Sequence, residues 1–423
     1  LKFSYDELSA IIAAAVQNTK IARDTSASSQ EKYIALDIGP CGRLLKPYGD
    51  LDFEEAVSLF AEVVRLGAAN GVDLIYIETM SDSYETKAAL LAAKENCNLP
   101  VFVSNAYGED GKLMTGASPS AMVALAEGMG ADAIGANCSL APKQMHGVVK
   151  ELLENASIPV LLKPNAGLPQ EENGKAVYAT LPDEFAADMA EYSHKGVRIT
   201  GGCCGTSPAY IQKLVGLCSE ITPVPLTDKQ ITCVSSYTHA VKFEAQPLLI
   251  GERINPTGKK RFKQALKEHD IDYILQEGIH QQECGVHILD VNVGLPEIDE
   301  PSMLKESVEE LQAVINLPLQ IDTSDAVTGA VSDPERICPI CSKSAGIRRK
   351  HRPGHSRRTG SQRLYPERNP CRIPSKKQIG GDRNEYIRIR QRRGRTKTAK
   401  GRIRSRIERG GIAKSKRNSY GVE

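Results

Sequence analysis

Three cysteines of this 423-residue chain follow predicted strands, where their thiols could act together. Cys203 and Cys204 are adjacent, and glycines on both sides of the pair allow the backbone to turn sharply. Cys138 ends another predicted strand. Three thiolates form a soft ligand set for zinc, and a fourth position left to substrate is typical of a catalytic site. The spacing also leaves open buried structural cysteines and a redox pair.

The elements that would position these thiols are six repeats of a strand followed by a helix. Nearly continuous apolar runs predict strands at Tyr33–Gly39, Asp73–Thr79, Pro100–Tyr107, Ala133–Ser139, Pro159–Asn165 and Val197–Cys204. Helical patterns lie at about 52–70, 83–96, 118–128, 143–155, 182–194 and 207–218. Such alternation indicates an α/β fold with a parallel sheet, either an open doubly wound sheet or part of an eight-stranded barrel.

Two features at the start of the chain favour an N-terminally incomplete barrel. Apolar residues recur at helical spacing from Leu8 to Val16 with no strand before them, and the first residue is not Met. We therefore expect a TIM-type (β/α)8 barrel lacking its first strands. Polar residues cluster at the predicted strand ends, and in a barrel these ends face one mouth, where active sites lie.

Five short segments of residues 5–218 together resemble the homocysteine S-methyltransferase family. They are Asp37–Pro40, Glu78-Thr79, Asn137–Leu140, Pro164–Pro169 and Gly201–Thr206, of which the last, Gly-Gly-Cys-Cys-Gly-Thr, is the most specific. The resemblance implies Zn²⁺ held by Cys138, Cys203 and Cys204, which act in catalysis through the metal, and homocysteine as the substrate that supplies the fourth ligand. It also implies Glu78, as a partner of the substrate ammonium, and Asn137 as substrate-binding residues.

A second strand and helix series follows a predicted linker at 219–247. We expect strands at 247–254, 286–292 and 317–323, with helices at about 259–284 and 301–315. The stretch Gly251–Gly258 and the polar strand ends resemble the pterin-binding family, whose barrels bind reduced folates. This resemblance implies a truncated second TIM-type barrel over 248–325. Its methyltetrahydrofolate pocket would be lined by Asn255, Asp290, Asn292 and Asp322.

The order of the two modules resembles the family of cobalamin-dependent methionine synthases. In that family, methyltetrahydrofolate methylates cobalamin, which then passes the methyl group to zinc-bound homocysteine. An Asp-x-His-x-x-Gly motif for cobalamin is absent from the 423 residues. The resemblance therefore implies a cobalamin-binding module on a missing segment or a separate chain. A runner-up is a cobalamin-independent homocysteine methyltransferase with a sulfonium or betaine donor.

The last part of the chain differs sharply in charge from the rest. Residues 331–423 hold 28 Lys and Arg against 7 Asp and Glu, or +21, whereas residues 1–330 hold 26 against 45, or −19. We expect disorder over 326–423, because so polar a segment buries too little apolar surface. An out-of-frame translation is the favoured explanation. Nucleic-acid binding through the basic tail and a zinc finger of Cys338, Cys341, His351 and His355 are the alternatives.

Composition places the protein among soluble globular chains. Apolar residues make up 41% of it, no apolar run approaches the roughly 18 residues of a membrane span, and no secretory signal is present at the start. We therefore predict a cytoplasmic methyltransferase with no membrane partner, in which the eleven cysteines are reduced.

Overall fold

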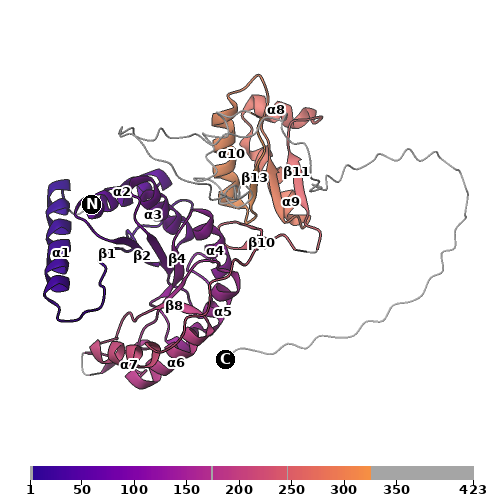
Figure 1. Cartoon of the computed structure of the whole chain (residues 1–423). Coiled ribbons are helices and arrows are strands. Elements are labelled where there is room, and N and C mark those ends of the chain that lie inside the picture. The colour runs from indigo at the N-terminus through magenta and orange to yellow at the C-terminus, as the bar shows by residue number, and fades with distance from the viewer. Residues whose placement is uncertain (1–2, 173–174, 245, 325–423) are drawn as a thin grey trace, which may run out of the picture. The chain divides into compact units, whose positions relative to one another are not determined.

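A computed structural model describes residues 3–172, 175–244 and 246–324 (Figure 1). Its main sheet has six parallel strands in the order β1-β2-β3-β4-β5-β8. The strands are β1 (Ala35–Ile38), β2 (Leu74–Met80), β3 (Val101–Asn105), β4 (Ala133–Asn137), β5 (Val160–Lys163) and β8 (Val197–Thr200). The order follows the chain without the reversal that a doubly wound sheet requires, which excludes that alternative. The α/β class with a parallel sheet is thus confirmed.

Helices precede, connect and follow the strands of this sheet, and those that connect them lie on one side of it (Figure 1). They are α1 (Tyr5–Thr25), α2 (Phe53–Ala69), α3 (Ser83–Asn96), α4 (Pro119–Gly128), the 3₁₀ helix η1 (Pro142–Met145), α5 (His146–Asn155), α6 (Pro182–Lys195) and α7 (Pro208–Cys218). The polar residues Ser4, Asp52, Asp82 and Ser118 cap four of them through side-chain oxygens. Local chemistry therefore fixes where these helices begin.

The core of this first module lies between the sheet and its helices. All five residues of β4 are buried, and the run Ala88–Ala93 of α3 is buried on every side. Gly135 of β4 lies so close to β5 that a Cβ on it would meet the carbonyl oxygen of Leu161 at 1.9 Å. Burial of central strands such as β4 on both faces explains why their apolar runs in the sequence are nearly continuous.

The second module contains a parallel sheet of β11 (Ile250–Ile254), β12 (Ile288–Val291) and β13 (Leu319–Ile321). Its helices are α8 (Lys260–Glu268), α9 (Ile271–Glu283) and α10 (Glu300–Val314). The single helix expected at 259–284 is wrong, because two helices occupy this range. His269 has a left-handed φ of 57°, and Asp270 then caps α9 by accepting a hydrogen bond from the Tyr273 N–H at 3.1 Å. His269 therefore ends α8, and Asp270 starts α9.

Two antiparallel hairpins were not predicted. One pairs β6 (Pro169–Glu172) with β7 (Lys175–Tyr178), and the other pairs β9 (Cys233–Ser235) with β10 (Ala240–Lys242) inside the expected linker. The β9–β10 turn contacts the first module, since the Tyr237 hydroxyl donates to Asp82 at 3.0 Å.

The expected tail over 326–423, with its proposed finger and nucleic-acid site, falls outside the described residues. Closure of either sheet into a full barrel stays a prediction, as do the domain boundaries. Among the helices of the described ranges, none combines the length and apolar character needed to cross a membrane.

Candidate metal and substrate site

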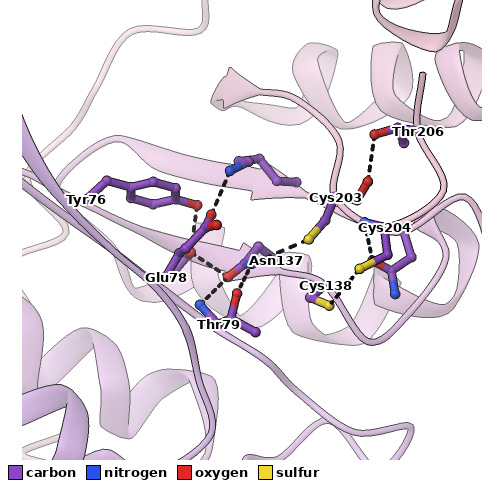
Figure 2. A network of polar contacts seen from close by, with 11 residues as sticks. Tyr76, Glu78, Thr79, Asn137, Cys138, Cys203, Cys204 and Thr206 are labelled. Atoms are coloured by element: carbon purple, nitrogen blue, oxygen red, sulfur yellow. Dashed lines mark hydrogen bonds and ion pairs between the residues drawn. The ribbon is translucent and has the colours of Figure 1, made fainter. Parts of the chain in front are cut away.

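The three predicted thiols converge at the carboxyl ends of β4 and β8. Their sulfur atoms all lie within 4.8 Å of one another, and the Sγ atoms of Cys138 and Cys204 are 3.9 Å apart (Figure 2). Tetrahedral zinc with bonds of about 2.3 Å to sulfur requires ligand sulfurs about 3.8 Å apart. Small side-chain rotations would therefore bring all three thiols to a zinc ion.

Backbone geometry beyond the strand ends produces this convergence. Cys138 takes a left-handed φ of 60°, which turns the chain immediately after β4. The N–H of Cys138 donates to the Lys163 carbonyl at 3.0 Å, and the N–H of Cys203 donates to the Pro164 carbonyl at 2.8 Å. The N–H of Cys204 donates to Oδ1 of Asn165 at 3.0 Å. The end of β5 thus holds both cysteine loops.

The electrostatics of the cluster favour a bound cation. Burial, followed by the neighbouring Cys138 thiol, raises the pKa of Cys203 to about 12. The same causes raise the pKa of Cys204. Three thiolates cannot coexist so close together without positive charge between them, and a metal ion reverses this effect by deprotonating the thiols that bind it. The donor set and its spacing therefore fit zinc.

Asn137 is a fully buried hub between the thiols and β2. Its Oδ1 accepts hydrogen bonds from the Thr79 N–H at 2.9 Å and from the Ser104 hydroxyl at 2.6 Å. Its Nδ2 donates to Oγ1 of Thr79 at 2.7 Å and faces the Cys203 sulfur at 3.9 Å (Figure 2). Thr79 has a left-handed φ of 62°. Asn137 therefore fixes a strained strand end beside a candidate metal ligand.

A charged pair lies next to this hub. The Lys163 ammonium contacts the Glu78 carboxylate at 2.6 Å, with 26% and 17% of the two side chains exposed, and lies 4.6 Å from the centre of the Tyr76 ring. Glu78 is on β2 and Lys163 on β5, which in a flat sheet would be separated by three strand spacings, about 14 Å. Their contact shows that the sheet curls strongly, as a barrel wall does.

A further acidic group lies near this pair, on the edge strand. Desolvation, and then the Glu78 carboxylate, raise the pKa of Asp37 on β1. Lys163 acts in the opposite direction and lowers it. One cation therefore compensates two carboxyl groups on the inner side of this sheet.

Three of the four residues predicted to bind a pterin directly follow strands of the second sheet, and the fourth lies inside one. Asn292 donates to the Asp322 carboxylate at 3.1 Å, and Asn255 follows β11 directly. Asp290 is buried within β12, and its Oδ1 has no partner among the described residues. Burial, and then the carboxylates of Asp322 and Glu252, raise the pKa of Asp290 to about 7. The structure thus brings Asp290, Asn292 and Asp322 together.

Sequence reasoning missed two side chains of the first site, Tyr76 and Ser104, whose hydroxyls lie 2.8 Å apart. Both are inside predicted strands and read as ordinary strand residues. The available signal was the two-residue period of β2, which places Tyr76 on the same face as Glu78. Lys163 was recognised only as one of several polar strand ends.

Comparison with known proteins identifies relatives of this chain. The homocysteine S-methyltransferase family model matches residues 2–218. Methionine synthase of Mycobacterium leprae (strain TN) is 30% identical over 320 residues, which are 72% of this chain and 26% of that protein. Methionine synthase of Mycobacterium tuberculosis (strain ATCC 25618 / H37Rv) is 30% identical over 317 residues, with the same coverage. The chain therefore spans about a quarter of the length of these curated relatives.

Matches among solved structures include the homocysteine methyltransferase MmuM from Escherichia coli. Its metallated form is 21% identical, with a TM-score of 0.44, and the match covers 51% of this chain and 73% of that one. The apo form gives 20% identity and a TM-score of 0.42, with coverages of 51% and 75%.

Proposed function

This chain belongs to the homocysteine S-methyltransferase family, and we propose that its residues 1–218 carry the site that transfers a methyl group to the thiol of homocysteine. The observation that carries the proposal is the convergence of three thiols within 4.8 Å beside a hydrogen-bonded asparagine and a half-buried Glu–Lys pair. A thiol ligand set with one open position, next to charged groups, suits a small amino acid that carries its own thiol.

Each residue has a role in this proposal. Cys138, Cys203 and Cys204 would hold zinc, which when bound keeps a substrate thiol deprotonated near neutral pH. Asn137 keeps Cys203 in place, and Glu78 offers a carboxylate to the substrate ammonium. In the reaction the substrate sulfur forms a bond to the methyl carbon. The bond between that carbon and its donor breaks, and its electron pair stays with the donor.

For the second module we propose binding of methyltetrahydrofolate as the methyl source. The support is the group of amide and carboxyl side chains at the ends of β12 and β13, which present paired donors and acceptors to a flat heterocycle. Because its pKa lies near 7, Asp290 is partly protonated at neutral pH and can donate a hydrogen bond as well as accept one.

The donor that reaches the first site is proposed to be methylcobalamin, carried by a module outside these 423 residues. The test supplies the zinc-loaded chain and homocysteine with one of three donors: methylcobalamin, a methylsulfonium compound or betaine. Methionine formed from methylcobalamin supports the proposal. Methionine formed only from the sulfonium or betaine donor would instead establish the cobalamin-independent alternative. A Cys204→Ala variant, which removes one proposed ligand, should be inactive with every donor.

A further inference from the structure

The Lys163–Glu78 pair has features that a purely structural ion pair does not need. Both side chains stay partly exposed, at 26% and 17%, although they project from the inner side of a curled sheet. Lys163 has three ammonium N–H groups, and its polar contacts within the described residues use one of them, on a single carboxylate oxygen of Glu78. Both charges therefore keep hydrogen-bonding capacity that their mutual contact does not use.

The position of Lys163 ties it to the thiol cluster. In the β4–β5 register Lys163 pairs directly with Asn137, and its carbonyl oxygen accepts the N–H of Cys138 at 3.0 Å. Adjacent strands are about 4.8 Å apart, so Lys163 starts one strand spacing from the residue that precedes a candidate zinc ligand. A thiol compound held at the cysteines would have its other end beside this charged pair.

The neighbouring sequence holds Lys163 in this position. Pro164 restricts the residue before it to extended conformations, which keeps Lys163 in line with β5. On the other side, a Cβ on Gly201 would lie 3.1 Å from Cγ of Lys163. The glycine therefore leaves room for the aliphatic stem of the lysine, and the Tyr76 ring covers its ammonium group at 4.6 Å.

We propose that Lys163 binds the α-carboxylate of the substrate, next to Glu78, to which the proposed function already assigns the α-ammonium, so that the pair receives the whole amino-acid zwitterion. The assignment of the carboxylate to Lys163 rests on the proposed function of the thiol site. In the free protein the two side chains neutralise each other. A bound zwitterion gives each of them a new partner of opposite charge, so that no half-buried charge is left alone.

Three small thiol compounds distinguish recognition of the carboxylate from recognition of the ammonium group. They are homocysteine, 3-aminopropanethiol, which lacks the carboxylate, and 4-mercaptobutanoate, which lacks the amine. Titration calorimetry with the zinc-loaded chain gives the affinity of each. Lys163→Met should weaken binding of homocysteine and 4-mercaptobutanoate by about tenfold to a hundredfold, the value of one charge-assisted hydrogen bond. Binding of 3-aminopropanethiol should stay equal or become tighter, because Glu78 is then unpaired. Glu78→Gln should show the opposite pattern.

Controls separate recognition from damage to the fold. Lys195→Met removes a surface lysine whose partner is Glu191 and should leave all three affinities unchanged. Lys163→Arg should restore 4-mercaptobutanoate binding. The ratio of two affinities within one variant is unaffected by a loss of folded protein. In the Glu78→Gln, Lys163→Met double variant, which lacks both proposed partners of the zwitterion, both analogues should bind at least tenfold more weakly.

Two results would overturn the assignment. In the first, the wild type binds homocysteine through zinc, but Lys163→Met weakens the binding of all three thiol compounds equally or of none of them. The lysine is then not the carboxylate receptor, and the proposed function stands. If the zinc-loaded wild type binds none of the three thiols, both the proposed function and the zwitterion receptor are wrong.

Discussion

Replacement of Asn137 by alanine gives the sharpest test of how the site is held together. The change removes the partner of the Thr79 N–H, of the Ser104 hydroxyl and of Oγ1 of Thr79, which lie 2.9, 2.6 and 2.7 Å from the amide. Leaving a buried N–H unpaired costs about 1–3 kcal/mol, and each of the other two bonds contributes about 1 kcal/mol. We therefore expect a loss of about 3–5 kcal/mol in the free energy of unfolding.

Urea unfolding followed by circular dichroism measures this loss, since the chain has no tryptophan to report by fluorescence. Asn155→Ala is the matched control, because Asn155 is also buried but its Nδ2 makes one hydrogen bond, to the Glu151 carbonyl. The control should lose less than about 1 kcal/mol. Asn137→Ala should also weaken zinc binding about 10–100-fold. If both variants unfold at the same urea concentration, the hub account of Asn137 is incorrect.

Two further predictions concern the second sheet and the packing of β4. Since the pKa of Asp290 is raised to about 7, its ionisation opposes folding. The stability of the wild type should therefore fall by about 2–4 kcal/mol, relative to Asp290→Asn, as the pH rises from 4 to 7; parallel pH profiles of the two proteins would contradict this. Gly135→Ala should lower the free energy of unfolding by about 1–3 kcal/mol or more, because its Cβ would meet the Leu161 carbonyl. Gly147→Ala on α5, where a Cβ has nothing within 4 Å, should leave that free energy unchanged or raise it, as urea unfolding would show.

Most elements of the first module were predictable because a central strand such as β4 is buried on both faces. Its apolar residues then form continuous runs, and the helix between two strands starts at a recognisable cap such as Asp52 or Ser118. The break between α8 and α9 was not predicted, because apolar residues continue at helical spacing from Phe262 to Ile274 across it. Two residues separate the helices: His269 has a left-handed backbone, and Asp270 was the available capping signal.

The thiol cluster was predictable from sequence, whereas the charged pair beside it was not. Three cysteines at two strand ends must meet if the strand ends share one mouth. Glu78 and Lys163 come from strands that are not neighbours in the sheet, so their contact depends on how strongly the sheet curls. Curvature is a property of the whole packed module, and no local pattern in the sequence reports it.

Zinc content tests the central claim most directly. The wild-type chain, purified with zinc and dialysed, should retain about one equivalent by atomic absorption. Cys138→Ala, Cys203→Ala and Cys204→Ala should each lose it. Cys97→Ala and Cys218→Ala, which alter cysteines away from the cluster, should keep it. Zinc retained at one equivalent in all three cluster variants, or lost equally in the two controls, would contradict the assignment of these thiols as the metal site.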